Sequence, residues 1–189
     1  MNIMYIHGFG SKFSSESNKS VALKSIGELY GFDYDTSEYA NVNLHKMTEF
    51  ANSNKIDIVL GTSLGGWYAS QLGRILDIPF VSINPATEPH ITLNAYEGEG
   101  IDYYNRKYNL SKDVIDNYWS FDTSGDGLVL LETGDEVIDY KKTLSFLSNS
   151  KSITTHVRVG GNHRYEGIKE SLGIILKHYL DNVSLGSKC

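Results

Sequence analysis

The chain has 189 residues, of which 40% are hydrophobic and 21% are charged, and these values are typical of one globular domain with a single core. Its net charge of −6 argues against a nucleic-acid-binding surface, and the sequence lacks the run of about 20 apolar residues that a membrane span needs. We therefore expect one domain over residues 1–189, with neither nucleic acid nor a membrane as partner.

Strands and helices are predicted to alternate along the first half of the chain. The predicted elements are a strand at 2–6, a helix on which Ala22, Ile26, Leu29 and Tyr30 share a face, a short strand at 32–34, a helix marked by Leu44, Met47 and Phe50, a buried strand that begins near Ile56, a helix with Leu64, Trp67, Tyr68, Leu72 and Ile75 on one face, and a strand at 78–83. A sheet of parallel strands with intervening helices follows from this alternation.

The segment 88–125 breaks the alternation and is rich in tyrosine and acidic residues. Within it, Ser111 is the predicted N-cap of a short helix that runs through Val114, Ile115 and Tyr118. After it come a strand at 128–131, a turn at 134–136, a helix at 140–147, a strand at 153–159, and a last helix with Ile168, Leu172, Ile175, Tyr179 and Leu180 on one face. The fold class is therefore α/β, with about six mainly parallel strands and helices on both faces. In such sheets ligands bind beyond the carboxyl ends of the strands, so segment 88–125 is a predicted lid or pocket wall.

The central motif is Gly61-x-Ser63-x-Gly65, placed between a predicted strand and a predicted helix. This pattern is typical of a nucleophile elbow, a strained turn that exposes the serine hydroxyl. Side chains two residues before and after the serine would collide across so sharp a turn. The alternative is an ordinary strand-to-helix turn, and the rest of the chain decides between them.

A serine nucleophile needs a histidine base, and the base needs an acid to orient it. Ser63, Asp135 and His163 occur in the chain order serine, acid, histidine, and each follows a predicted strand. Three nearby carboxylates compete with Asp135 for the role of acid: we expect Asp139 to cap the next helix and Glu136 to face solvent, whereas Asp126 precedes the strand. Among the other histidines, His156 and His178 are predicted to be structural or exposed, and His90 remains a candidate pocket residue.

An oxyanion hole requires two N–H donors. Leu64 follows the nucleophile and would supply one, and the glycine-rich loop after the first strand would supply the other from Phe9. We expect His7 to stabilise this loop, and the alternative is merely a glycine-rich turn. The predicted pocket residues are His7, Gly8, Gly10, Trp67, Tyr96 and Tyr104.

Five matches in order make the chain resemble the small α/β-hydrolase esterases of the YqiA/YcfP type, a UPF0227-like family. The matches are YIHGF at 5–9, GTSLGGWYA at 61–69, INPA at 83–86, TGDEVIDY at 133–140 and GGNH at 160–163. The resemblance implies a minimal α/β-hydrolase fold with Ser63 as nucleophile, Asp135 as acid, His163 as base and no cofactor. Asn162 departs from the pattern, because relatives more often have an acidic residue there.

Together these features predict a serine esterase that acts on a small-molecule acyl ester, with a thioester as an alternative. Two other functions remain open: acyl transfer to another alcohol or thiol, and a binding or regulatory protein on a hydrolase scaffold. The aromatic insertion indicates an apolar acyl or aryl pocket, or simply tyrosines that cover the sheet edge. No metal-binding spacing occurs among the histidines, and the sequence makes no prediction of the oligomeric state.

The location is predicted from the cysteine content and the N-terminus. Cys189 is the only cysteine, so no internal disulfide can form, which fits a reducing compartment. Residues 1–6 lack the regions of a signal peptide. We expect a cytoplasmic location.

Overall fold

The computed structural model describes residues 1–186, and Cys189 therefore lies outside the described residues. A six-stranded sheet forms its centre, with all neighbouring strands parallel in the order β2-β1-β3-β4-β7-β8. Its strands are β1 (Asn2–Ile6), β2 (Glu28–Phe32), β3 (Ile58–Thr62), β4 (Phe80–Ile83), β7 (Gly127–Glu132) and β8 (Ile153–Arg158). The predicted sheet of about six parallel strands is confirmed.

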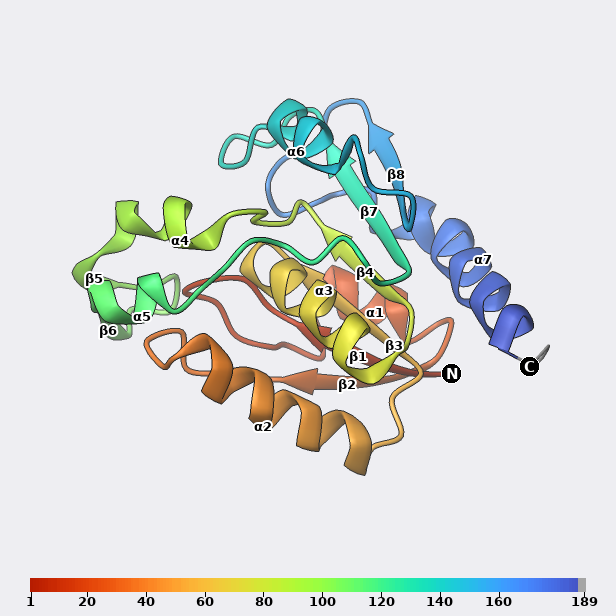
Figure 1. The fold of residues 1–189 in the computed structure, drawn as a ribbon, viewed down its shortest axis with the longest axis horizontal. Helices are drawn as coiled ribbons and strands as arrows, with labels where there is room; N and C mark the ends of the chain where they lie inside the picture. The colour runs from red at the N-terminus through yellow and green to blue at the C-terminus, as the bar shows by residue number, and fades with distance from the viewer. Residues whose placement is uncertain (187–189) are drawn as a thin grey trace.

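Helices cover both faces of this sheet, as Figure 1 shows. They are α1 (Asn18–Leu23), α2 (Ala40–Ser53), α3 (Leu64–Leu76), α6 (Tyr140–Leu147) and α7 (Ile168–Gly186). One core joins α2, α3 and α6 to the sheet, and a second core joins α1 and α7 to the opposite face. Of the helices within residues 1–186, none combines the length and the apolar character required to cross a bilayer.

Strand periodicity explains why a single sheet serves two cores. In β7, Val129 and Leu131 pack in the α3 core, whereas Leu128 and Leu130 pack in the α7 core. Successive side chains of a strand point to opposite faces, so a strand covered on both faces has apolar residues at every position. Glu132, the last residue of β7, interrupts this apolar run and is nevertheless fully buried.

Several sequence predictions for these elements were wrong. Helix α1 ends at Leu23, so Ile26 lies in the following turn, and Leu29 and Tyr30 belong to strand β2 instead of the predicted helix. The strand predicted at 32–34 lies earlier, at Glu28–Phe32. Ile75 and Leu180 are about half exposed and do not face a core. Leu29 and Tyr30 occupy a short apolar run, in which strand and helix periodicity cannot be told apart.

The part of segment 88–125 that contains helices and strands lies at one end of the sheet, at the left of Figure 1, and the chain after it runs back across the molecule to β7. It contains α4 (Pro89–Thr92), the 3-10 helix η1 (Leu93–Tyr96), the antiparallel strands β5 (Gly98–Ile101) and β6 (Lys107–Leu110), and α5 (Lys112–Asp116). Ser111 caps α5 as predicted, because its side chain accepts a hydrogen bond from the N–H of Val114. The β5–β6 hairpin was not predicted.

Asp139 caps α6 as expected, and Asp139 Oδ1 accepts a hydrogen bond from the N–H of Lys141 at 2.9 Å. We expect Asp139→Ala to lower the free energy of unfolding by about 1 kcal/mol, because an N–H at the helix start loses its partner. Urea unfolding measures this change, and Asp139→Asn is the control that keeps the capping oxygen. Equal stability of the alanine variant and the wild type would contradict the capping role.

Candidate active site

Ser63 lies in the turn between β3 and α3 and has left-handed backbone angles, φ 57° and ψ −120°. A residue other than glycine reaches this region only when its surroundings enforce it. Here the N–H of Ser63 donates to Ile83 O at 2.9 Å, and Ser63 O accepts from the N–H groups of Gly66 and Ala86. The turn is thus held from both sides, as a nucleophile elbow requires.

The two flanking glycines are required by close backbone contacts. A Cβ on Gly61 would lie 1.9 Å from Gly65 O, and a Cβ on Gly65 would lie 2.2 Å from Ile6 O. No side chain fits at these distances. The conflict at Gly61 lies across the turn, as predicted, whereas the conflict at Gly65 is with the end of β1. The same packing brings the end of β1 against the elbow, and a Cβ on Gly8 would lie 3.1 Å from the Cβ of Ser63.

His163 and Asp135 form the hydrogen bond that the sequence predicted. His163 Nδ1 lies 2.8 Å from Asp135 Oδ2 and 2.9 Å from Oδ1. Asp135 Oδ1 also accepts from the N–H groups of Val137 and Ile138, both at 2.8 Å. Because the carboxylate is almost completely buried and accepts only N–H donors, it favours the tautomer of His163 with the proton on Nδ1.

The competing carboxylates lie elsewhere. Glu136 is exposed, as expected, and its Oε2 accepts the backbone N–H of His163 at 2.9 Å, and this bond lowers the pKa of Glu136. Asp139 caps α6, and Asp126 precedes β7 at the opposite end of that strand from Asp135. The side chain that reaches the His163 ring is that of Asp135.

The predicted oxyanion donors, Phe9 and Leu64, border the elbow. Leu64 is the first residue of α3, so its N–H has no partner inside the helix. Phe9 lies in the loop after β1, and among residues 1–186 its N–H donates to no backbone carbonyl. Both residues line the same cavity as Ser63.

His7 anchors the loop that carries Phe9. Its ring stacks on Tyr34 at 4.5 Å between centroids, and Nδ1 lies 2.8 Å from Gly8 O. Nε2 lies 3.3 Å from Asp33 Oδ1 without hydrogen-bond geometry. Burial lowers the pKa of His7 and so favours the neutral ring, in which Nδ1–H donates to Gly8 O.

A cavity of about 860 Å³ contains Ser63 and His163 in its wall, together with residues of segment 88–125. Five of the predicted pocket residues line it: His7, Gly8, Gly10, Tyr96 and Tyr104. Trp67 is a correction, because its indole is fully buried in the α3 core and donates to Trp119 O at 2.7 Å. His90, the remaining candidate, does not line the cavity.

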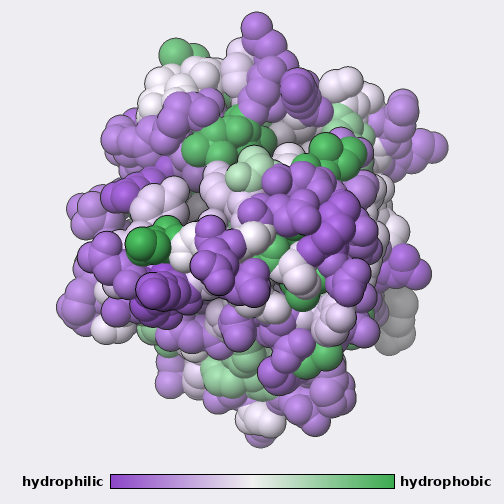
Figure 2. Space-filling model, turned by 90° about the vertical axis from the view of Figure 1, so that its left-hand side faces the viewer, coloured by the Kyte–Doolittle hydropathy of each residue, from purple (hydrophilic) through white to green (hydrophobic). Residues whose placement is uncertain are grey.

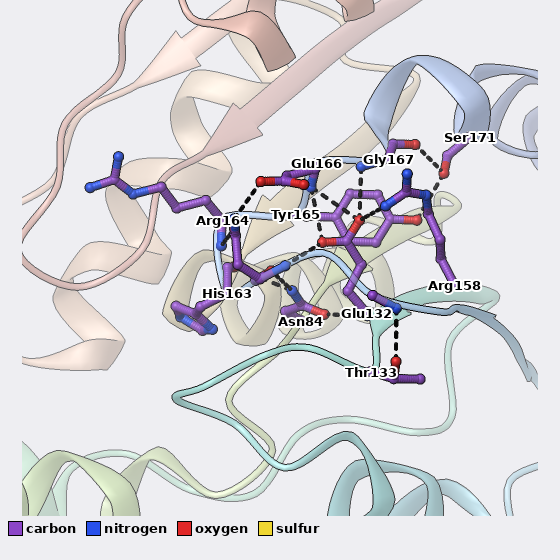
Figure 3. A network of polar contacts seen from close by, with 12 residues as sticks. Asn84, Glu132, Thr133, Arg158, His163, Arg164, Tyr165, Glu166, Gly167 and Ser171 are labelled. Atoms are coloured by element: carbon purple, nitrogen blue, oxygen red, sulfur yellow. Dashed lines mark hydrogen bonds and ion pairs between the residues drawn. The ribbon is translucent and has the colours of Figure 1, made fainter.

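Glu132 organises the loop that carries His163, as Figure 3 shows. Its carboxylate accepts from Arg158 Nη1 at 2.7 Å and from three backbone N–H groups of the loop, those of Asn162, Glu166 and Gly167, at 2.8 to 3.1 Å. A Cβ on Gly161 would lie 1.8 Å from Glu132 Oε2. The loop is therefore wrapped closely around one buried carboxylate.

Asn84 connects this loop to the strand end. Asn84 Nδ2 donates to Asn162 O at 3.1 Å and His163 O at 3.3 Å, and Asn84 Oδ1 accepts from the N–H of Glu132 at 3.0 Å. Sequence reasoning missed both Glu132 and Asn84. A signal existed for Glu132, since a carboxylate at the end of an apolar strand is buried only when it is hydrogen-bonded.

The comparisons with solved structures show the fold. Est1E from Butyrivibrio proteoclasticus superposes with a TM-score of 0.73 at 17% identity, over 97% of this chain and 88% of that chain. A monoacylglycerol lipase from Paleococcus ferrophilus superposes with a TM-score of 0.71 at 14% identity, over 96% and 94%. The predicted α/β-hydrolase fold is confirmed.

Sequence comparison gives the family. A UPF0227 protein of Vibrio vulnificus is 25% identical over 177 residues, which cover 90% of this chain and 94% of that protein. Residues 2–179 match the profile described as "Uncharacterised protein family (UPF0227)". This match spans nearly the whole chain and includes every motif on which the resemblance rested, so the chain belongs to the UPF0227 family.

Proposed function

We propose that this chain is a serine hydrolase that cleaves carboxylic esters through an acyl-Ser63 intermediate. The observation that carries the proposal is a histidine, His163, that shares a cavity with a serine at a strained elbow and lies 2.8 Å from the buried carboxylate of Asp135. The esterase and the lipase with the same fold support the reaction class.

In the proposed reaction His163 Nε2 removes the Ser63 hydroxyl proton as Oγ attacks the ester carbonyl. The N–H groups of Phe9 and Leu64 hold the resulting oxyanion. Collapse breaks the bond to the alcohol, which leaves with the proton from His163, and water then attacks the acyl-enzyme by the same steps. No hydrogen bond joins Ser63 Oγ to His163 within residues 1–186, and such contacts are often long in ligand-free enzymes.

Aromatic and apolar side chains border the cavity on the side of segment 88–125. The Phe9 ring lies 5.0 Å from the ring of Tyr96 and 5.2 Å from that of Tyr108, and Leu93 and Ile101 line the same wall. This surface favours an apolar acyl group next to Ser63.

The test is hydrolysis of p-nitrophenyl esters from acetate to palmitate, combined with a fluorophosphonate probe. We expect hydrolysis with an optimum chain length and one phosphonyl group on the peptide that contains Ser63. Heat-denatured protein is the control, because labelling requires the assembled site. If folded protein neither hydrolyses the esters nor reacts with the probe, the proposal is wrong and a binding role replaces it.

A further inference from the structure

The cavity next to Ser63 is lined by more positive than negative charge. Lys12, Lys19 and Arg164 lie in its wall, and Asp102 is the carboxylate that lines it. Asp102 is already paired, because its Oδ2 accepts from Arg106 Nε at 2.6 Å. A chain with a net charge of −6 thus places three cations at its candidate site.

None of these three cations has a carboxylate partner within the described part of the chain. The Lys12 ammonium lies 4.4 Å from the centroid of the Tyr104 ring, and the Arg164 guanidinium lies 6.0 Å from that of Tyr103. Cation–π contacts of this kind orient a charge without neutralising it.

Lys19 is the most constrained of the three. Its ammonium donates to the backbone oxygen of Arg164, which joins helix α1 to the His163 loop. Burial, together with the nearby charge of Arg164, lowers the pKa of Lys19 to about 8, although the charge of Glu132 partly opposes this shift. A half-buried cation without a directly paired carboxylate is costly, and an anion bound in the cavity would reduce that cost.

The positions of Lys19 and Arg164 place their charges near the alcohol half of the proposed ester substrate. Arg164 directly follows His163, and Lys19 contacts the Arg164 backbone. In the proposed reaction His163 delivers its proton to the departing oxygen, so the alcohol lies on the His163 side. The apolar wall of Phe9, Tyr96 and Tyr108 would face the acyl group.

We propose that the leaving alcohol of the substrate carries an anionic group, a carboxylate or a phosphate, that Lys19 and Arg164 bind with support from Lys12. This inference rests on the proposed esterase function. Figure 2 views the end of the molecule that carries segment 88–125, and its hydrophobic areas are small and separated by hydrophilic side chains. Such a face suits a charged, water-soluble alcohol better than an extended lipid surface.

The test compares esters that share an acetyl group and differ in the charge of the alcohol. The pairs are 4-acetoxybenzoate with its methyl ester, and 4-acetoxyphenyl phosphate with 4-methoxyphenyl acetate. We expect kcat/KM to be about tenfold higher for the anionic member, since a charge-assisted hydrogen bond has that order of effect. The two pairs distinguish a carboxylate from a phosphate.

Variants of Lys19 and Arg164 test whether these residues cause the preference for the anionic ester. Lys19→Gln and Arg164→Gln should each reduce the anionic-to-neutral ratio of kcat/KM about fivefold or more, and Arg164→Lys should restore part of it. Lys24→Gln is the matched control, because Lys24 Nζ also donates to a backbone carbonyl, Ser15 O at 2.9 Å, but lies outside the cavity lining. A ratio near one in the wild type, or a ratio that Lys19→Gln and Arg164→Gln leave unchanged, would overturn the inference.

A binding measurement separates this inference from the proposed function. Titration of ¹⁵N-labelled protein with 4-acetoxybenzoate and its methyl ester, followed by NMR, detects binding whether or not the esters are cleaved. Tighter binding of the anion that is lost in Lys19→Gln would support the subsite even if hydrolysis were absent. Equal binding of the two compounds would exclude the subsite even if both were hydrolysed.

Discussion

Replacement of Ser63 by alanine is expected to lower kcat for p-nitrophenyl ester hydrolysis by about four to six orders of magnitude. The hydroxyl is the proposed attacking group, and alanine has no hydroxyl to take its place. The oxyanion donors and the cavity remain in the variant, so KM should change far less than kcat. Steady-state kinetics with the best ester of the acyl series measures both constants.

The free energy of unfolding of Ser63 variants gives a second measurement. Alanine at position 63 keeps the strained backbone of φ 57°, so the free energy of unfolding should match the wild type. Glycine tolerates this conformation, and Ser63→Gly should therefore be inactive and more stable, by about 1 kcal/mol. Ser53→Ala, at the exposed end of α2, is the activity control. Equal rates for Ser63→Ala and wild type would refute Ser63 as nucleophile.

The parts of the site that could be predicted are those determined by local sequence. The elbow could be predicted from Gly61, Ser63 and Gly65 because the steric conflict at Gly61 lies within five consecutive residues, although the conflict at Gly65 is with Ile6 of β1. Asp135 and His163 were predicted from their positions after strands, because parallel strands bring their carboxyl ends to one sheet edge. His163 was chosen over His156 and His178, which also follow Asp135, because they lie within a predicted strand and a predicted helix and His163 lies at the end of a strand.

The features of the site that were not predicted depend on contacts between segments that are distant in the sequence. Trp67 was assigned to the pocket, yet its surroundings in the core are formed by Tyr118 and Trp119 of an irregular segment about 50 residues away. The anchoring role of Glu132 exists only because the loop 160–167 folds around it. Hydrophobic periodicity does not carry information about contacts between distant segments. The α/β class and the positions of the motifs could therefore be predicted, whereas the contacts of Trp67 and Glu132 could not.

Glu132 is the second position where we expect a large effect, through the geometry of His163. Its two oxygens accept from Arg158 and from three loop N–H groups, and the loop in turn holds the His163 ring against Asp135. Glu132 does not line the cavity that contains Ser63 and His163, so it would act as a positioning residue and not as a catalytic one.

We expect Glu132→Gln to lower the free energy of unfolding by about 3–5 kcal/mol, because one oxygen becomes an NH₂ group that faces N–H donors and Arg158 loses its buried counter-ion. Urea unfolding measures this loss. At a temperature where the variant is folded, kcat should also fall, and the low-field NMR signal of the His163 Nδ1 proton should shift or broaden, which a purely structural defect would not cause.

Glu166→Gln provides the matched control for this experiment. It changes an exposed carboxylate of the same loop, which accepts from Asn162 Nδ2 at 2.6 Å, and exposed polar contacts contribute little to stability. Its effects on unfolding and on kcat should therefore be much smaller than those of Glu132→Gln. A Glu132→Gln protein with wild-type stability would show that the loop does not depend on this carboxylate. If it were unstable but retained full kcat and an unchanged His163 signal, Glu132 would support the fold without positioning the base.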